Sequence, residues 1–181
     1  MRLKGAFKLA VVEYLAENLG IDKGAVAVGA KPGKPRPDCG DLFVCVWGGG
    51  RTFGLKTGLD VTQAVNLTLT KRFTGPMDRW DVALSAEEDG FDELAGRLIC
   101  LLTAGQNQIR ELVAAKLPDQ VDGTSEAPRV LNDPEADPVG ADWFGATTQN
   151  AQKGTLDVYG FAATIAFGGL RVTHPWDTAQ L

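Results

Sequence analysis

Residues 59–73 read LDVTQAVNLTLTKRF, and this stretch decides the fold class. Apolar side chains alternate with mostly polar ones from Val61 to Phe73, and only Gln63 and Lys71 interrupt the apolar set. Because successive residues of a strand point to opposite faces, the pattern predicts a strand with one packed face and one face that meets water or a partner. Its length is roughly twice the usual one. We therefore expect the strand to project past the core and to offer free backbone groups to another chain.

Helical spacing of apolar residues occurs on both sides of this strand. Residues 3–19 form one such stripe, and Gly20 follows as a helix stop. After the strand, a Gly-Pro turn leads to a second stripe that Gly105 interrupts and a third that ends before Pro118. We expect the second and third helices to cover the packed face of the sheet. The second stripe consists of Phe91, Leu94, Ala95, Leu98, Leu101 and Leu102.

A cluster of carboxylates marks the expected start of the second helix. Carboxylates in a first helical turn are stabilised by the helix dipole and by solvation, which is the simplest interpretation. A paired-carboxylate active site is the alternative, because general acid–base catalysis uses such pairs. The cluster consists of Glu87, Glu88, Asp89, Asp92 and Glu93.

Three further strands complete the predicted sheet. Residues 25–28 give a short strand, and residues 42–47 (LFVCVW) are continuously apolar, which is typical of a strand covered on both faces. Glycines 48–50 lack the spacing of a phosphate-binding loop and are interpreted as a flexible hairpin tip. Residues 155–173 give a last long strand with one face of small side chains. The predicted fold is α+β: one domain over residues 1–181, with a mostly antiparallel sheet of long strands packed on one face by helices.

Two segments are predicted to be irregular loops. Residues 30–40 (AKPGKPRPDCG) are rich in proline and basic side chains, so they form a solvated loop or an arm that contacts a partner or nucleic-acid phosphate. Residues 118–153 are acidic, with seven Asp/Glu against one base in 119–142. A loop of this length is either functional or ordered on binding. Its aromatic pair, Trp143 and Phe144, either anchors an interface or packs against the domain.

Charge is distributed unevenly along the chain. The net charge of the 181 residues is −5. Residues 1–72 carry 11 Lys/Arg against 6 Asp/Glu, whereas residues 73–181 carry 7 against 17. Either the two halves interleave and mix both signs on the surface, or the molecule has one basic and one acidic face. The second arrangement suits head-to-tail association, because opposite patches attract and like patches repel.

Common catalytic and metal-binding patterns are missing from the sequence. His174 is the only histidine, neither serine stands in a GxSxG setting, and no cysteines have metal-ligand spacing. We therefore expect no enzyme activity, no cofactor and no metal site. The three cysteines are odd in number, which indicates reduced thiols, with Cys45 and Cys100 packed as small core residues. No apolar run is long enough to span a membrane, so no membrane partner is expected.

The predicted order of elements is a helix, two strands, the long threonine-rich strand, a helix pair, an acidic loop and a final long strand. This order resembles the tail terminator, or tail completion, proteins of long-tailed bacteriophages. The residues that carry the resemblance are LDVTQAVNLTLTKRF (59–73), PMDRWD (76–81), FDELAGRLICLL (91–102) and, more loosely, DWFGATTQNAQKGTLDVYGFAATIAFGGL (142–170).

The resemblance implies a structural virion protein of the phage neck, assembled in the host cytoplasm. Its subunits would form a ring, expected to be a hexamer, that stops growth of the tail tube. The ring would bind the tail tube protein on one side and the head–tail connector protein on the other, and DNA would only pass through it. The alternatives are another head–tail adaptor or minor tail protein, and a small carboxylate-dependent enzyme. Contacts with partners are expected at Lys31, Lys34, Arg36, Lys71, Arg72, Trp143 and Phe144.

Overall fold

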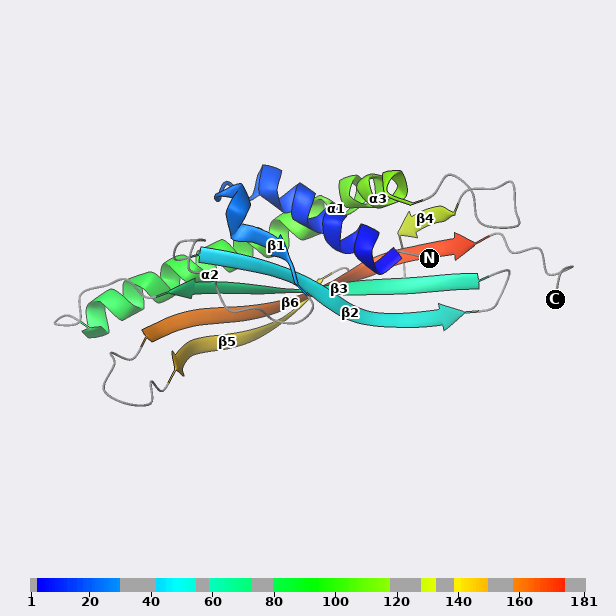
Figure 1. The fold of residues 1–181 in the computed structure, drawn as a ribbon. Helices are drawn as coiled ribbons and strands as arrows, with labels where there is room; N and C mark the ends of the chain where they lie inside the picture. Colours follow the sequence, from blue (N-terminus) through cyan, green and yellow to red (C-terminus); the bar gives the residue numbers. More distant parts are fainter. Residues whose placement is uncertain are drawn as a thin grey trace, which may run out of the picture.

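Helices and strands alternate along the chain and confirm the predicted α+β class (Figure 1). The computed structural model describes residues 3–29, 42–54, 59–72, 80–117, 128–132, 139–149 and 158–174. The helices are α1 (Leu3–Asn18), α2 (Trp80–Ala104) and α3 (Gln106–Ala115), with a 3-10 turn at Lys23–Ala25. The strands are β1 (Val26–Val28), β2 (Leu42–Gly54), β3 (Leu59–Arg72), β4 (Arg129–Asn132), β5 (Val139–Gln149) and β6 (Val158–His174).

The sheet places the two longest strands at its centre. Its order is β1-β2-β3-β6-β4, and β5 pairs with another part of β6. All pairs are antiparallel except β1 with β2, so the prediction of a mostly antiparallel sheet is confirmed. β3 pairs with β2 from Asp60 to Lys71 and with β6 from Leu59 to Arg72. The predicted projecting strand with free backbone groups is therefore wrong, because both neighbours are long enough to match β3.

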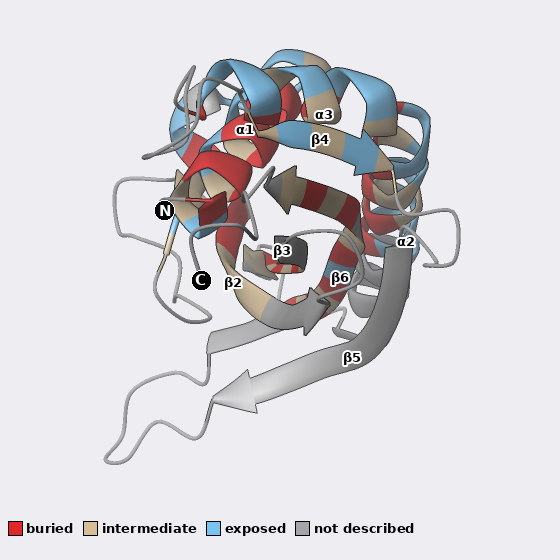
Figure 2. Cartoon of the chain, turned by 90° about the vertical axis from the view of Figure 1, so that its right-hand side faces the viewer, coloured by how far each residue is buried: buried red, intermediate tan, exposed pale blue. Residues whose placement is uncertain are grey.

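One core lies between the helices and the nearer face of the sheet. On the predicted apolar face of β3, Val65, Leu67 and Leu69 are buried. Phe7 of α1 and Phe91 of α2 meet two rings of β6, Phe167 and Phe161, with ring centres 5.6 and 5.5 Å apart. Figure 2 shows the buried residues concentrated between the helices and the sheet. Gln63 is 1% exposed, so it does not mark a projecting strand end as predicted.

The end of α1 and the break between α2 and α3 lie where the glycines predict them, but the start of α2 does not lie at the acidic cluster. Gly20, two residues after α1, has φ +75°, the left-handed conformation typical of a helix stop. Gly105 separates α2 from α3, as predicted. However, α2 begins at Trp80, so Glu87 lies roughly two turns inside the helix. Stabilisation of the acidic cluster by the helix dipole is therefore a wrong prediction, because the dipole acts mainly within the first turn. Asp89, Asp92 and Glu93 are exposed, which agrees with solvation of these carboxylates, the other part of the same prediction.

The triple glycine lies within a strand, not at a hairpin tip. β2 continues to Gly54, and its register against β3 shifts between Gly48 and Arg51, which marks a β-bulge. A Cβ at Gly49 would lie 2.7 Å from the backbone carbon and oxygen of Ala64. The predicted tip is wrong because the strand continues through these glycines, and Gly49 lets the backbones of β2 and β3 approach closely. The first half of β2 behaves as predicted: Phe43, Val44, Cys45 and Val46 are all buried.

The predicted acidic loop at 118–153 contains two strands, β4 and β5, which both pair with β6. The loop prediction is wrong for these residues because β6 is long enough to pair with both strands on the side opposite β3. The predicted loop at residues 30–40 lies outside the described residues. Cys45 and Cys100 are free thiols, and Cys45 is buried as predicted. Cys100 is exposed on α2, so its predicted core packing is wrong.

Candidate interaction surface

The sheet face that points away from the helices is the first candidate for an interaction surface. α1, α2 and α3 all lie on the other side of the sheet, so none of them covers it (Figures 1 and 2). Alternation along the strands assigns alanine, threonine and asparagine side chains of β3 and β6 and three side chains of β2 to this face. These residues are Phe43, Cys45, Trp47, Ala64, Asn66, Thr68, Thr70, Ala162, Thr164 and Ala166.

Hydrogen bonds fix the polar side chains of this face. The Trp47 Nε1–H donates to Thr68 Oγ1 at 3.0 Å, and the Thr70 hydroxyl donates to the carbonyl oxygen of Phe43 at 3.3 Å. Thr68 is 6% exposed, so the predicted water- or partner-facing side is wrong at the centre of the face. Asn66 and Thr70 are half-buried, as the prediction requires. Phe43 and Cys45 of the same face are buried as well, so a partner can reach this face only at its half-buried and exposed positions.

The edges of β2 and β5 are among the strand edges without a partner strand in the described part of the chain. β1 covers β2 only from Val44 to Val46, so the edge of β2 continues past it to Gly54. On the far side of the sheet, β5 pairs with β6 alone. Unpaired backbone groups on a strand edge are a template for a strand from another chain. Because the two edges differ and lie on opposite sides, they suit a head-to-tail contact between copies.

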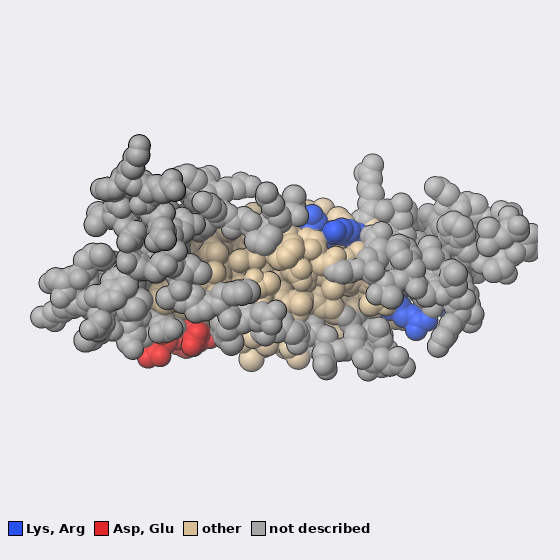
Figure 3. Space-filling view, turned by 90° about the horizontal axis from the view of Figure 1, so that it is seen from below, with Lys and Arg blue, Asp and Glu red and all other residues tan. Residues whose placement is uncertain are grey.

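Charge separates along this side of the molecule. Among the described residues, acidic side chains gather toward one end, basic side chains toward the other, and uncharged residues fill the middle (Figure 3). Asp89, Asp92 and Glu93 of α2 are exposed carboxylates. Basic residues also lie close to these acids, because Lys71 and Arg97 line one pocket with Glu93. The two arrangements that the sequence allows therefore both stay open.

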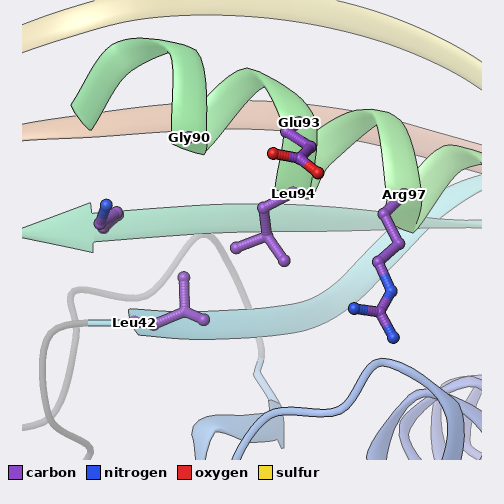
Figure 4. A pocket seen from close by; sticks show the side chains of 6 residues that line it. Leu42, Gly90, Glu93, Leu94 and Arg97 are labelled. Carbon is purple, nitrogen blue, oxygen red and sulfur yellow. The ribbon is translucent and has the colours of Figure 1, made fainter. Parts of the chain in front are cut away.

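A pocket opens at the gap between α2 and the sheet. Its volume is about 370 Å³, and it is lined by the beginning of β2, the end of β3 and the middle of α2. In Figure 4, Leu94 points from the helix toward the strands and Leu42 points toward the helix. Two cations and one carboxylate share the wall with these leucines. The lining residues are Leu42, Lys71, Gly90, Glu93, Leu94 and Arg97.

The structure locates some of the predicted contact residues. Lys71 is half-buried and lines the pocket. The backbone of Arg72 pairs with Gly160 of β6. Both residues were predicted to make contacts because the end of the strand was expected to project from the sheet. That reason is wrong, because β3 is paired on both sides there. Their role in contacts stays a prediction.

The remaining predicted contact residues fall into two groups. Trp143 and Phe144 lie in β5, with their backbones opposite Ala163 and Ala162, not in an irregular loop. The basic residues Lys31, Lys34 and Arg36 lie outside the described residues. Of the predicted contact residues that the structure describes, Trp143 and Phe144 lie on β5, and β6 separates this strand from Lys71 of β3.

Sequence reasoning missed Trp47 and Arg97. Trp47 is the last residue of the apolar run in β2, and its side chain lies on the same sheet face as the threonines of β3. The alternating pattern of β3 could therefore have pointed to Trp47. Arg97 follows Glu93 by four residues on a helix, a spacing that places the two side chains side by side. That spacing alone does not reveal a pocket, because Leu42 and Lys71 come from distant parts of the chain.

The described residues also bear on metal binding and on membrane insertion. They contain no group of three or more His, Cys, Asp or Glu that could hold a metal ion. No helix in the described ranges has the length and apolarity needed to cross a membrane. No model of a known protein family matches the chain, and no curated protein matches it significantly.

Proposed function

We propose that this chain is a structural subunit of the phage neck, whose copies form a ring that ends the tail tube and joins it to the head-side connector. The observation that carries the proposal is the arrangement of the elements. Helix α1, the long threonine-rich β3, the α2–α3 pair and the long final β6 occur in the order on which the resemblance to tail terminator proteins rests. Ring assembly in the host cytoplasm and a place in the virion belong to the same proposal.

The surfaces of the molecule support repeated association. A ring needs two different patches that bind each other, so that each copy can contact two neighbours. The edges of β2 and β5, which have no partner strand among the described residues, could provide such a pair of unlike patches. The tail tube and the connector are then partners at the two sides of the ring.

Electron microscopy and a mass measurement in solution test the proposal. We expect the full chain to form rings of uniform size, with six copies as the first expectation, and to be a component of assembled particles. A protein that stays monomeric at high concentration and is missing from virions would contradict the proposal. Trp47→Ala, on the face without helices, should weaken assembly, whereas Leu9→Ala on the exposed side of α1 should leave it unchanged.

Two alternatives are separated by direct experiments. Cross-links from the ring to the tube protein favour a terminator, and cross-links only to the portal favour a head–tail adaptor. A carboxylate-dependent enzyme would lose activity in a Glu87→Gln, Glu88→Gln, Asp92→Asn triple variant that still folds. Asp92 is exposed on α2, so its substitution should not disturb the core.

A further inference from the structure

One end of the sheet has an edge without a partner strand on each of its two sides. The registers align residues 51–54 of β2 with 60–63 of β3, then with 170–173 of β6, and finally with the four residues of β4. β1 pairs with β2 only at residues 44–46, so it does not reach this level. Among the described residues, the outer edges of β4 and of 51–54 therefore have no partner strand, and they lie on opposite sides of this end of the sheet (Figure 1).

The directions of the strands suit a contact between these two edges in different copies. β2 with β3, β3 with β6 and β6 with β4 are all antiparallel pairs, so β4 runs opposite to β2. Copies related by rotation about an axis along the strands keep the same strand directions. In such an arrangement β4 of one copy meets β2 of the next as an antiparallel neighbour, which is the slightly more stable kind of pair.

An exposed aliphatic side chain on β4 would be covered by a further strand. Leu131 is 47% exposed, whereas most large apolar side chains of the described residues are buried. Through Arg171 and Thr62, the registers place Leu131 level with Thr52 of β2. Side chains that face each other across two paired strands lie close together, so a strand from another copy would remove apolar surface of Leu131 from water.

We propose that β4 of one copy adds as an antiparallel strand to residues 51–54 of β2 in a second copy. A second copy is the occupant because every chain carries both edges, at the same level, with matching direction and equal length. Pairing of unlike edges repeats head to tail and can close into a ring. The inference rests on the proposed function and names the strands that join neighbouring subunits. A pair of four residues is short, so ring closure, which gives each copy two such contacts, supplies the remaining stability.

Cross-linking between two kinds of chain tests the contact. Leu131→Cys and Thr52→Cys proteins are co-expressed in a background with Cys39→Ser and Cys100→Ser, and the assemblies are treated with a short bismaleimide. We expect covalent dimers that contain one chain of each kind. Leu131→Cys protein alone should give none, because a head-to-tail contact keeps the two copies of this residue apart. Leu9→Cys, on the exposed side of α1, is the matched control and should not cross-link to Thr52→Cys.

A charge on the β4 edge provides an independent test. Leu131→Lys should raise the protein concentration needed for half-assembly by about two- to fivefold, because a lysine on an edge strand opposes pairing with another strand, whereas Leu9→Lys should not change it. Circular dichroism and thermal unfolding check that both variants fold.

The outcomes separate the strand contact from the proposed function. Normal rings that lack the cross-link and tolerate Leu131→Lys would overturn the strand contact and leave the proposed function standing. Cross-links in Leu131→Cys protein alone would also overturn it, because they indicate a two-fold contact. Cross-linked open chains without closed rings would support the strand contact and contradict the ring.

Discussion

At the scale of single residues, Tyr14 and Gly105 meet where α2 passes into α3. The Tyr14 hydroxyl donates a hydrogen bond to the carbonyl oxygen of Leu101 at 3.0 Å, and a Cβ at Gly105 would overlap the tyrosine ring. Gly105→Ala must therefore displace the ring or the helix junction. We expect the free energy of unfolding to fall by about 1–3 kcal/mol, the usual range for overpacking, as measured by urea denaturation.

Gly96→Ala is the matched control for this substitution. Gly96 is also a glycine near the end of α2, but a Cβ there meets nothing within 4 Å. Removing a glycine from a helix interior should raise the free energy of unfolding by up to about 1 kcal/mol. A Gly105→Ala protein as stable as the Gly96→Ala protein would show that the contact with Tyr14 is not tight.

Tyr14 also predicts a response to alkaline pH. Burial raises the pKa of its phenol above the ordinary value, because the charged form loses hydration. The folded state therefore holds the proton more tightly than the unfolded chain. The contribution of protonated Tyr14 to the free energy of unfolding is complete below about pH 10. It is lost as the pH rises from there toward the pKa of Tyr14 in the folded state. Unfolding of wild-type protein and Tyr14→Phe across this range should show the smaller loss of stability in the variant.

At the scale of elements, the bulge in β2 makes two adjacent glycines unequal. Gly49→Ala would place a Cβ 2.7 Å from the backbone of Ala64 in β3, and two paired strands cannot easily separate. At Gly48 the nearest atoms belong to the end of the flexible Lys4 side chain, which can move away. We expect Gly49→Ala to lower the midpoint of thermal unfolding clearly and Gly48→Ala to change it little. Equal shifts would mean that the bulge does not hold the strands at this distance.

Helices and strands in which apolar residues recur at a regular spacing could be predicted from the sequence, and elements without such spacing could not. The alternation in 59–73 and the stripe in 3–19 gave β3 and α1, because one face of each element is buried in a single core. β5 contains two glycines and an acid in the sequence VGADWFGATTQ, so its period is weak, and it forms by pairing with β6. Pairing between strands is a property of the whole sheet that local sequence does not reveal.

At the scale of the whole molecule, the pocket is formed by residues that are far apart in the sequence, so local sequence patterns could not predict it. Leu42, Lys71 and Arg97 are separated by tens of residues, and only the pairing of Leu42 with Lys71 and the path of α2 bring them together. The surplus of acids in the second half of the chain could be read from the sequence. Its arrangement in space depends on the fold, which brings Lys71 of β3 and Arg97 of α2 beside Glu93.

Separated charges predict how assembly responds to salt. If the acidic end of one copy contacts the basic end of the next, attraction should weaken as the Debye length falls from about 10 Å at 0.1 M salt to about 3 Å at 1 M. Sedimentation velocity should then show fewer rings at high salt. An interface held mainly by apolar contact would instead be unaffected or strengthened. Asp89→Asn with Asp92→Asn should weaken assembly at low salt and reduce its salt dependence, because both carboxylates are exposed on α2.

Glu111→Gln provides the control, since it removes the same kind of charge from an exposed site on α3, which lies toward the other end of the molecule (Figure 1). Loss of an acid there should leave assembly unchanged or strengthen it, because that end is expected to meet acids of the neighbouring copy. Equal weakening by the α2 and α3 variants would contradict a directional contact, since any loss of acidic charge would then act through net charge alone. A salt response that survives the Asp89 and Asp92 substitutions would place the attracting acids elsewhere on the surface.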